Sequence, residues 1–240
     1  MRIPALLGIA LGALTLLPLQ AAATPISTTI ELNTVFAGGT PNGNVPWLTA
    51  TFTSSVGSKT GTLVMSLNTN APDFIQGLNN KNAAVGWAFY LDQGLSGLTC
   101  ENNGGNCASN NALYNGSFNS GPVPGPFNLA FGWSAQDRFM SGDSATYELT
   151  FLDLLTGNPF VENTGGWSSV AHIQGFPTNL GCGTSGWIVS GSGSGAQGNV
   201  CDPNPHTPPP VNVPEPGELG IFGLGLLFAG LFLGLRRRED

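Results

Sequence analysis

The sequence is poor in charge and poorer still in basic residues. Asp, Glu, Lys and Arg make up 9% of 240 residues, and only 7 of these are Lys or Arg. Between Thr24 and Val213 ten acidic residues face three basic ones, Lys59, Lys81 and Arg138. Such a balance repels nucleic-acid phosphates and anionic lipid headgroups. We therefore expect no nucleic-acid partner.

Histidine is rarer, with 2 residues, His172 and His206. Because general acid–base and nucleophilic catalysis most often needs a histidine beside a partner group, this scarcity argues against an enzyme. His172 lies in a predicted strand, where a structural role is expected, and no metal-ligand pattern surrounds either residue. Asp137, Asp143 and Asp153 are spaced too irregularly for a calcium loop, which leaves open a calcium site built from distant residues. We expect no catalytic residue, resident metal or cofactor.

The N-terminal 23 residues are typical of a secretory signal peptide. Arg2 gives a basic start, an apolar stretch runs from Ala5 to Leu19, and Ala21 and Ala23 are small residues at a cleavage site. Cleavage after Ala23 leaves Thr24 as the new terminus. The chain is therefore expected to be exported.

The C-terminal segment predicts one transmembrane helix. Leu219 to Leu235 is a run of 17 residues without charge, near the shortest length that spans a bilayer core. Arg236, Arg237 and Arg238 follow it and mark the cytoplasmic side, which places the preceding chain outside the membrane. A buried core helix is the alternative, and the arginine cluster argues against it.

A three-residue motif precedes this helix. Pro214, Glu215 and Pro216, followed by a glycine-bearing apolar helix and a basic cluster, closely resemble the PEP-CTERM sorting signal of Gram-negative bacteria. The resemblance covers residues 213–240 and implies that an exosortase, a membrane-embedded cysteine transpeptidase, cuts near the motif and transfers the protein to a surface acceptor. It also implies an exopolysaccharide or biofilm setting. A proline-rich spacer is the alternative interpretation of the motif.

Four cysteines, Cys100, Cys107, Cys182 and Cys201, lie in the predicted exported region, where an oxidising compartment permits disulfides. Three connectivities are open. Proximity in sequence favours Cys100 with Cys107 and Cys182 with Cys201. Spacings of seven and nineteen do not resemble a zinc pattern, so we expect disulfides and no metal.

Apolar residues recur at every second position in several short blocks, which predicts half-buried strands. These blocks lie within 48–52, 63–67, 85–91, 127–133 and 145–151, and further strands are expected over 26–33, 168–174 and 187–190. No amphipathic helix is evident, and Gly, Asn, Pro and Ser fill the connections. The pattern predicts an all-β chain with a single jelly-roll-like β-sandwich over residues 24–202. Trp87, Phe89, Phe131 and Trp133 are expected in its core.

Two segments outside these blocks differ from them in composition. Leu98 to Pro126 is rich in Asn and Gly and predicts a long loop, and long loops are disproportionately functional. Residues 203–212 form a proline-rich stalk before the sorting signal.

Three functions are consistent with this organisation. The first is a non-enzymatic cell-surface or extracellular-matrix protein that is sorted at the Pro-Glu-Pro motif. The second is a carbohydrate-binding module that holds exopolysaccharide or another surface glycan on the 98–126 segment. The third is a hydrolase of extracellular polymer, which needs two facing carboxylates such as Glu148 with Asp92 or Glu162.

Overall fold

The computed structural model of the protein describes residues 23–77, 86–101, 106–109, 113–176 and 183–194. Several predicted features lie outside the described residues: positions 1–22 of the signal peptide, the stalk, the sorting motif, the apolar run, the arginine cluster, Cys182 and Cys201. All regular elements in the described part are strands. Within these ranges, no helix with the length and apolar character of a membrane span was found.

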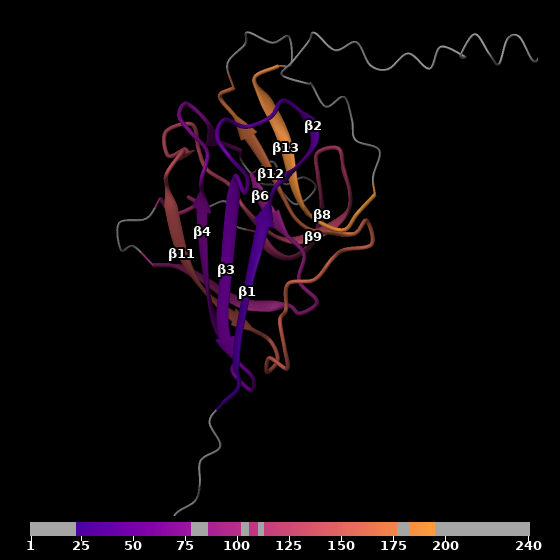
Figure 1. Ribbon diagram of the computed structural model, residues 1–240. Coiled ribbons are helices and arrows are strands. Elements are labelled where there is room, and N and C mark those ends of the chain that lie inside the picture. The colour runs from indigo at the N-terminus through magenta and orange to yellow at the C-terminus, as the bar shows by residue number, and fades with distance from the viewer. Residues whose placement is uncertain (1–22, 78–85, 102–105, 110–112, 177–182, 195–240) are drawn as a thin grey trace, which may run out of the picture. The chain divides into compact units, whose positions relative to one another are not determined.

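Five antiparallel strands form the first sheet, sheet A (Figure 1). Its order is β1 (Pro25–Leu32), β3 (Leu48–Ser55), β4 (Thr60–Leu67), β11 (Ser144–Phe151) and β7 (Leu95–Cys100). The first four strands bury every second residue, as the period-two pattern predicts. One face of the sheet is therefore apolar and the other polar.

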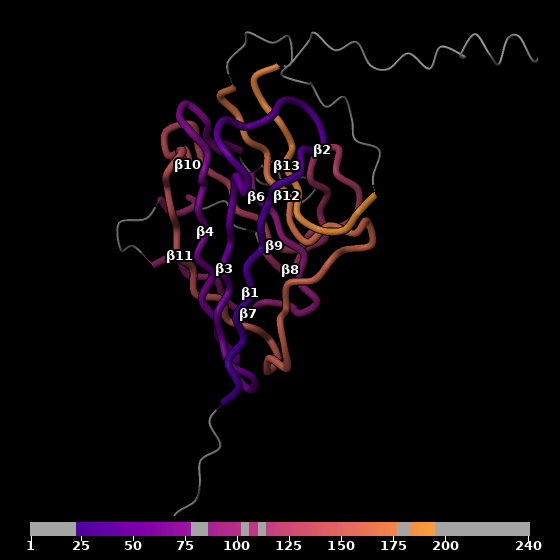
Figure 2. The backbone as a smooth tube through the Cα atoms, viewed as in Figure 1, coloured from indigo at the N-terminus to yellow at the C-terminus, as the bar shows by residue number. Residues whose placement is uncertain are grey.

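Eight strands form the second sheet, sheet B. Its main path is β10 (Phe139–Met140), β5 (Phe74–Ile75), β12 (Trp167–Gln174), β6 (Trp87–Phe89), β9 (Val123–Phe131) and β8 (Leu113–Ser120), and β13 (Ser185–Gly191) joins β12 to β2 (Thr34–Gly38). The chain passes between the two sheets several times, as Figure 2 shows from indigo β1 to orange β13. The two antiparallel sheets make a β-sandwich, which confirms the all-β prediction.

The main core lies between the sheets and is dominated by aromatic side chains. Trp87, Phe89, Phe131 and Trp133 are fully buried, as predicted. Trp87 and Phe89 stack at 5.4 Å between ring centroids, and the Trp87 Nε1–H donates to Ser169 Oγ at 2.9 Å. The buried indole is thus satisfied within the core.

Sheet B is buried on both of its faces, which alternation alone did not predict. Ala88, Ala130, Val170 and Val189 belong to a second apolar cluster, whereas their neighbours in the strands belong to the main core. Successive residues of a strand point to opposite faces, so this cluster lies on the far side of the sheet. It also contains Phe118, from β8, together with other residues of the β8–β9 region.

The predicted long loop over 98–126 is wrong in its larger part. β7 continues to Cys100, and β8 and β9 form a hairpin that the Gly, Asn and Pro content concealed. Gly121 adopts positive φ in the turn between the two strands. Asn115 and Gly125 do so within β8 and β9, whose register shifts twice, so turn-forming residues here also serve irregularities within strands.

Candidate functional site

Two tight turns, one just before β12 and one just after β13, create a cavity beside β2. The first turn is organised by Asn163, whose Oδ1 accepts hydrogen bonds from the backbone N–H of Gly165 at 2.8 Å and of Trp167 at 3.1 Å. Its Nδ2 donates to the carbonyl of Pro126 at 3.1 Å. One asparagine side chain therefore fixes where β12 begins.

The second turn packs directly on the first. Gly193 N–H donates to the Gly166 carbonyl at 2.8 Å, and Gly191 is the register partner of Trp167 in the β12–β13 ladder. A Cβ on Gly193 would lie 2.4 Å from Cε2 of the Trp167 indole, so only glycine allows this approach. The backbone of the second turn consequently lies against the indole.

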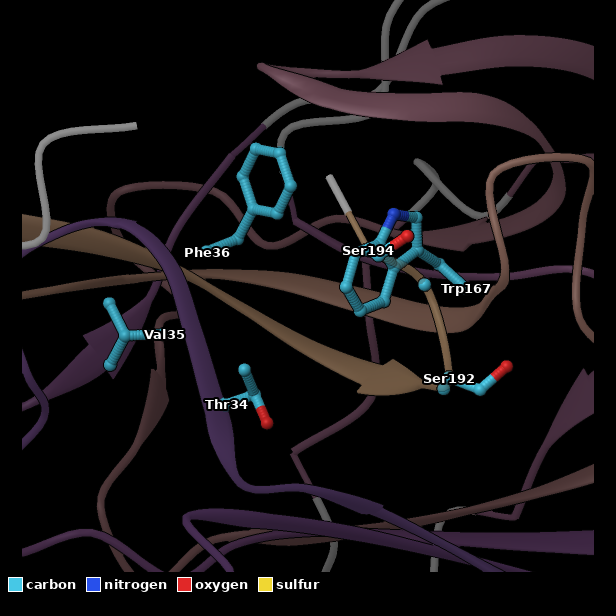
Figure 3. A pocket seen from close by; sticks show the side chains of 8 residues that line it. Thr34, Val35, Phe36, Trp167, Ser192 and Ser194 are labelled. Atoms are coloured by element: carbon cyan, nitrogen blue, oxygen red, sulfur yellow. The ribbon is translucent and has the colours of Figure 1, made fainter. Parts of the chain in front are cut away.

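The cavity has a volume of about 370 Å³ and combines aromatic and hydroxyl groups (Figure 3). It is lined by Thr34, Val35, Phe36, Trp167, Gly191, Ser192, Gly193 and Ser194. Phe36 and Trp167 meet edge to face, with ring centroids 5.7 Å apart, and each is 4% exposed. The hydroxyl-bearing residues Thr34, Ser192 and Ser194 are exposed at its mouth.

The polar groups beside this cavity differ in whether they have hydrogen-bond partners. The Trp167 Nε1–H is buried and has no hydrogen-bond partner within the described structure. Ser192, by contrast, donates its backbone N–H and its hydroxyl to the two carboxylate oxygens of Glu162, at 2.7 and 2.6 Å. The indole N–H is therefore unpaired but buried beneath the cavity wall, and the Ser192 hydroxyl is already committed as a donor.

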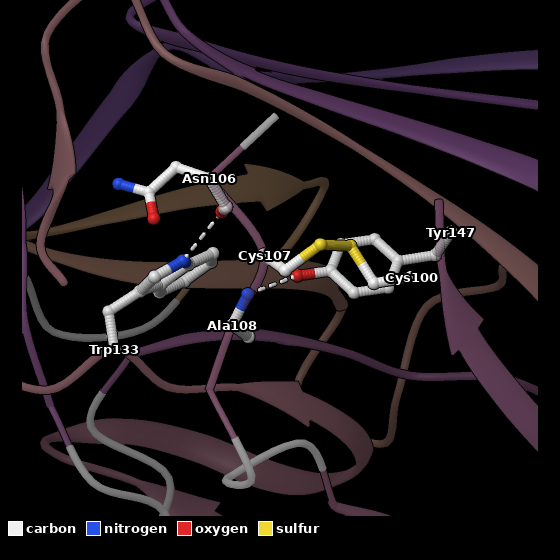
Figure 4. Close-up of a disulfide and its surroundings, with 6 residues drawn as sticks. All are labelled: Cys100, Asn106, Cys107, Ala108, Trp133 and Tyr147. Carbon is white, nitrogen blue, oxygen red and sulfur yellow. Dashed lines mark hydrogen bonds between the residues drawn. A yellow bond between two sulfur atoms is a disulfide. The ribbon is translucent and has the colours of Figure 1, made fainter. Parts of the chain in front are cut away.

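The predicted disulfide between Cys100 and Cys107 is present, with the two Cα atoms 6.0 Å apart (Figure 4). The residues on either side of Cys107, Asn106 and Ala108, supply partners for two buried aromatic side chains. Trp133 Nε1–H donates to the Asn106 carbonyl at 2.9 Å, and the Tyr147 hydroxyl accepts the Ala108 N–H at 2.6 Å. Burial raises the pKa of Tyr147 to about 12. The disulfide segment therefore completes the core at this edge.

The three carboxylates named for a hydrolase lie in three separate segments, of which only that of Glu148 is a strand. Glu148 is exposed on the outer face of β11, and Asp92 is exposed just after β6, where desolvation raises its pKa. Glu162 lies in the segment before β12 and is bonded to Ser192. The described residues contain no group of three or more His, Cys, Asp or Glu side chains arranged to hold a metal ion. The hydrolase stays an untested prediction.

His172 has a packing role. It stacks on Trp187 with ring centroids 4.5 Å apart and planes 15° from parallel. Burial lowers the pKa of this histidine, because the charged form loses solvation.

Asp73 is a fully buried carboxylate that the sequence reasoning did not single out. It accepts hydrogen bonds from the Asn42 backbone N–H, at 2.7 Å, and from the Asn42 side-chain amide. Desolvation nevertheless raises its pKa above 3.8.

A folded-state pKa above the unfolded value makes stability fall as pH rises between the two values, because the folded state holds the proton longer. We expect the free energy of unfolding to decline with pH above about 3.8 until Asp73 is deprotonated in the folded state. Asp73→Asn should remove that part of the slope in urea unfolding series, and Asp137→Asn, at an exposed position, should keep it. Equal slopes in wild type and Asp73→Asn would contradict this.

The fold defines an antiparallel β-sandwich protein, and the cavity at Trp167 is a candidate site in its described part. No protein-family model, no curated protein and no solved structure matches the chain. Trp167 and Ser192 were not predicted as site residues. The available signal was the glycine pairs around them, Gly165 with Gly166 and Gly191 with Gly193.

Proposed function

We propose that the protein is a non-enzymatic cell-surface or extracellular-matrix protein that is exported and then sorted by an exosortase at Pro214 to Pro216. The supporting sequence features are the signal peptide ending at Ala23, the apolar run from Leu219 to Leu235 and the arginine cluster after it. The helix would hold the chain in the membrane until it is processed. The setting is an exopolysaccharide matrix.

The start of the fold supports export with removal of the leader. β1 begins at Pro25, two residues after the predicted cleavage at Ala23. The Thr24 carbonyl accepts the Val56 N–H at 2.8 Å, so the chain is already engaged at the proposed new terminus. A jelly-roll-like connection stays part of the proposal; the chain passes between the sheets several times, while β3–β4, β8–β9 and β12–β13 each pair within one sheet.

The outer face of sheet A supports the proposed matrix role, because rows of hydroxyl groups cover it. Three cross-strand rows follow from the register: Glu31–Thr49–Ser66–Ser144, Thr29–Thr51–Val64–Thr146 and Ser27–Thr53–Thr62–Glu148. No residue in these rows is buried, and none is cationic. A face of this kind is suited to a hydrated, neutral glycan surrounding, since it offers hydrogen bonds without ionic attraction.

Sorting is tested by the intact mass and the C-terminal peptide of the protein recovered from its native cell surface. We expect a chain that ends near Pro214 to Pro216, with a mass increment if an acceptor is attached. Glu215→Ala should leave the C-terminal segment in place, whereas Glu218→Ala, three residues further on, should be processed like wild type. An intact Asp240 terminus in the steady-state wild-type population would refute processing and make the helix a permanent anchor.

A further inference from the structure

We propose that the outer edge of β1 pairs with β1 of a second copy of this chain, which joins the two sheets A edge to edge. β1 lies at the margin of sheet A, beside β3 in Figure 1, and within the described residues β3 is its only strand partner. The inference goes beyond the sorting and matrix functions proposed above and rests on neither of them.

The regularity of β1 is the first argument. An exposed edge strand offers unpaired backbone groups, and proteins usually blunt it by shortening it, bulging it or covering it. β1 is eight residues long and stays in register with β3 over all eight, without a shift. Its proline, Pro25, is its first residue, and its one charged residue is Glu31. The edge is therefore suited to accept another strand.

The other sheet edges in the described part are irregular. The register of β7 with β11 shifts between Thr150 and Phe151, and β7 ends at the disulfide-bonded Cys100. β8 shifts twice against β9, β2 is paired with β13 across a shift, and β10 has two residues. Bulges and short strands obstruct pairing with a further strand. Among these edges β1 is the exception.

The backbone groups of β1 alternate between β3 and the outer edge, as they do in any antiparallel ladder. The Thr24 carbonyl accepts the Val56 N–H at 2.8 Å at one end of the strand, and the Leu32 carbonyl accepts the Trp47 N–H at 3.1 Å at the other. The even-numbered residues of β1 therefore bond toward β3. The residues that turn both N–H and C=O toward the outer edge are Ser27, Thr29 and Glu31.

These three residues are complementary to themselves. In an antiparallel pair of β1 strands centred on Thr29, Thr29 lies opposite Thr29 of the second copy, and Ser27 lies opposite Glu31 of the second copy. Each outward N–H then meets an outward carbonyl, as bonded pairs require. The serine hydroxyl faces a carboxylate, and no like charges are opposed. This self-complementarity favours a second copy over an unrelated segment.

The pairing should be reversible. One strand from each copy covers much less than the roughly 1,600 Å² of a standard interface, so the dimer is weak when the copies diffuse freely. Copies held on one surface have a higher effective concentration, which favours the pair. Because side chains such as Thr29 stay outside the ladder, the hydroxyl faces of the two copies would continue across the junction.

The test begins with the full chain in detergent micelles, studied by sedimentation equilibrium over a series of protein concentrations. We expect a concentration-dependent equilibrium between monomer and dimer. Thr29→Pro removes an outward N–H from each copy and should weaken the dimer about thirtyfold, the effect of two hydrogen bonds. Its unfolding midpoint should stay close to wild type, because this N–H is not used in the β1–β3 ladder. Thr29→Ala keeps the N–H and should dimerise like wild type.

Cysteine cross-linking gives an independent readout. Bonded partners in an antiparallel pair have Cα atoms about 5.5 Å apart, within the roughly 4.4–6.8 Å that a disulfide spans. Thr29→Cys should therefore form a covalent dimer on oxidation, seen by non-reducing electrophoresis. Thr51→Cys is the matched control, because Thr51 is the register partner of Thr29 on the next strand inward and their hydroxyls share a hydrogen bond. It should remain monomeric.

Three results would overturn the proposal. They are a wild type that stays monomeric at every concentration, a dimer that Thr29→Pro leaves unchanged, and equal cross-linking of Thr29→Cys and Thr51→Cys. The sorting proposal stands or fails separately, because it is read from the C-terminal peptide.

Discussion

Replacing Phe52 with alanine should lower the free energy of unfolding by about 3–5 kcal/mol, the cost of removing a large aromatic side chain from a packed core. Phe52 is 0% exposed and lies on the inner face of β3. Its ring is 5.2 Å from that of Phe160 and 5.9 Å from that of Phe151, centroid to centroid. A Cβ on Gly61 would lie only 2.4 Å from it, so the neighbouring strand is shaped around this ring.

Urea unfolding followed by tryptophan fluorescence and by far-UV circular dichroism measures this loss. Val64→Ala is the matched control, because Val64 lies on β4 with its side chain on the outer face and is 37% exposed. It should change the free energy of unfolding by no more than about 0.5 kcal/mol. A Phe52→Ala variant as stable as Val64→Ala would mean that the two sheets do not pack through this ring.

Loss of the Cys100–Cys107 disulfide is the second large effect. The double variant Cys100→Ser, Cys107→Ser should lower the free energy of unfolding by about 2–4 kcal/mol, because the unfolded chain loses a constraint. The native state also suffers. Without the disulfide, the backbone that pairs Trp133 and Tyr147 is less firmly held.

Tyr147→Phe separates these two causes. It removes the hydroxyl that accepts the Ala108 N–H and should cost about 1 kcal/mol in the oxidised protein. In the double cysteine variant the same substitution should cost less, if the disulfide is what keeps Ala108 in reach. Equal costs in both backgrounds would show that the hydrogen bond and the disulfide act independently, and a double cysteine variant as stable as wild type would refute the main prediction.

Four of the five strands of sheet A, namely β1, β3, β4 and β11, were predictable because one face of each is polar and open to solvent. In β3 apolar and hydroxyl side chains alternate from Leu48 to Thr53, and in β4 the exposed Val64 is an apolar exception; the structure buries the inward apolar set of both strands. In sheet B the same alternation did not predict that the second face of the strands is also buried. Ala88 and Ala130 read as the outward positions of half-buried strands, yet they pack in the second cluster. Small apolar residues at outward positions were the available signal for a covered face.

The cavity could not be predicted from local sequence, since its two turns are far apart in the chain. The antiparallel register of β12 and β13 brings Trp167 opposite Gly191, and only then does Ser192 reach the site. The stretch after β13 is rich in serine and glycine, a composition typical of flexible connections. Its first residues are instead bonded to Glu162 and Gly166.

Because sheet B is buried on both faces, its strands should differ in how readily they open to solvent. β12 is paired with β13 along one side and with β6 and β5 along the other, and its residues are shared between both apolar clusters. Such a strand cannot detach in a local fluctuation, so its amides should be among the last to exchange with solvent. Trp167 is the first residue of this strand. The wall of the cavity is therefore attached to the strand whose amides should exchange last. By contrast, β1 is an edge strand of sheet A, and its amides should exchange earlier.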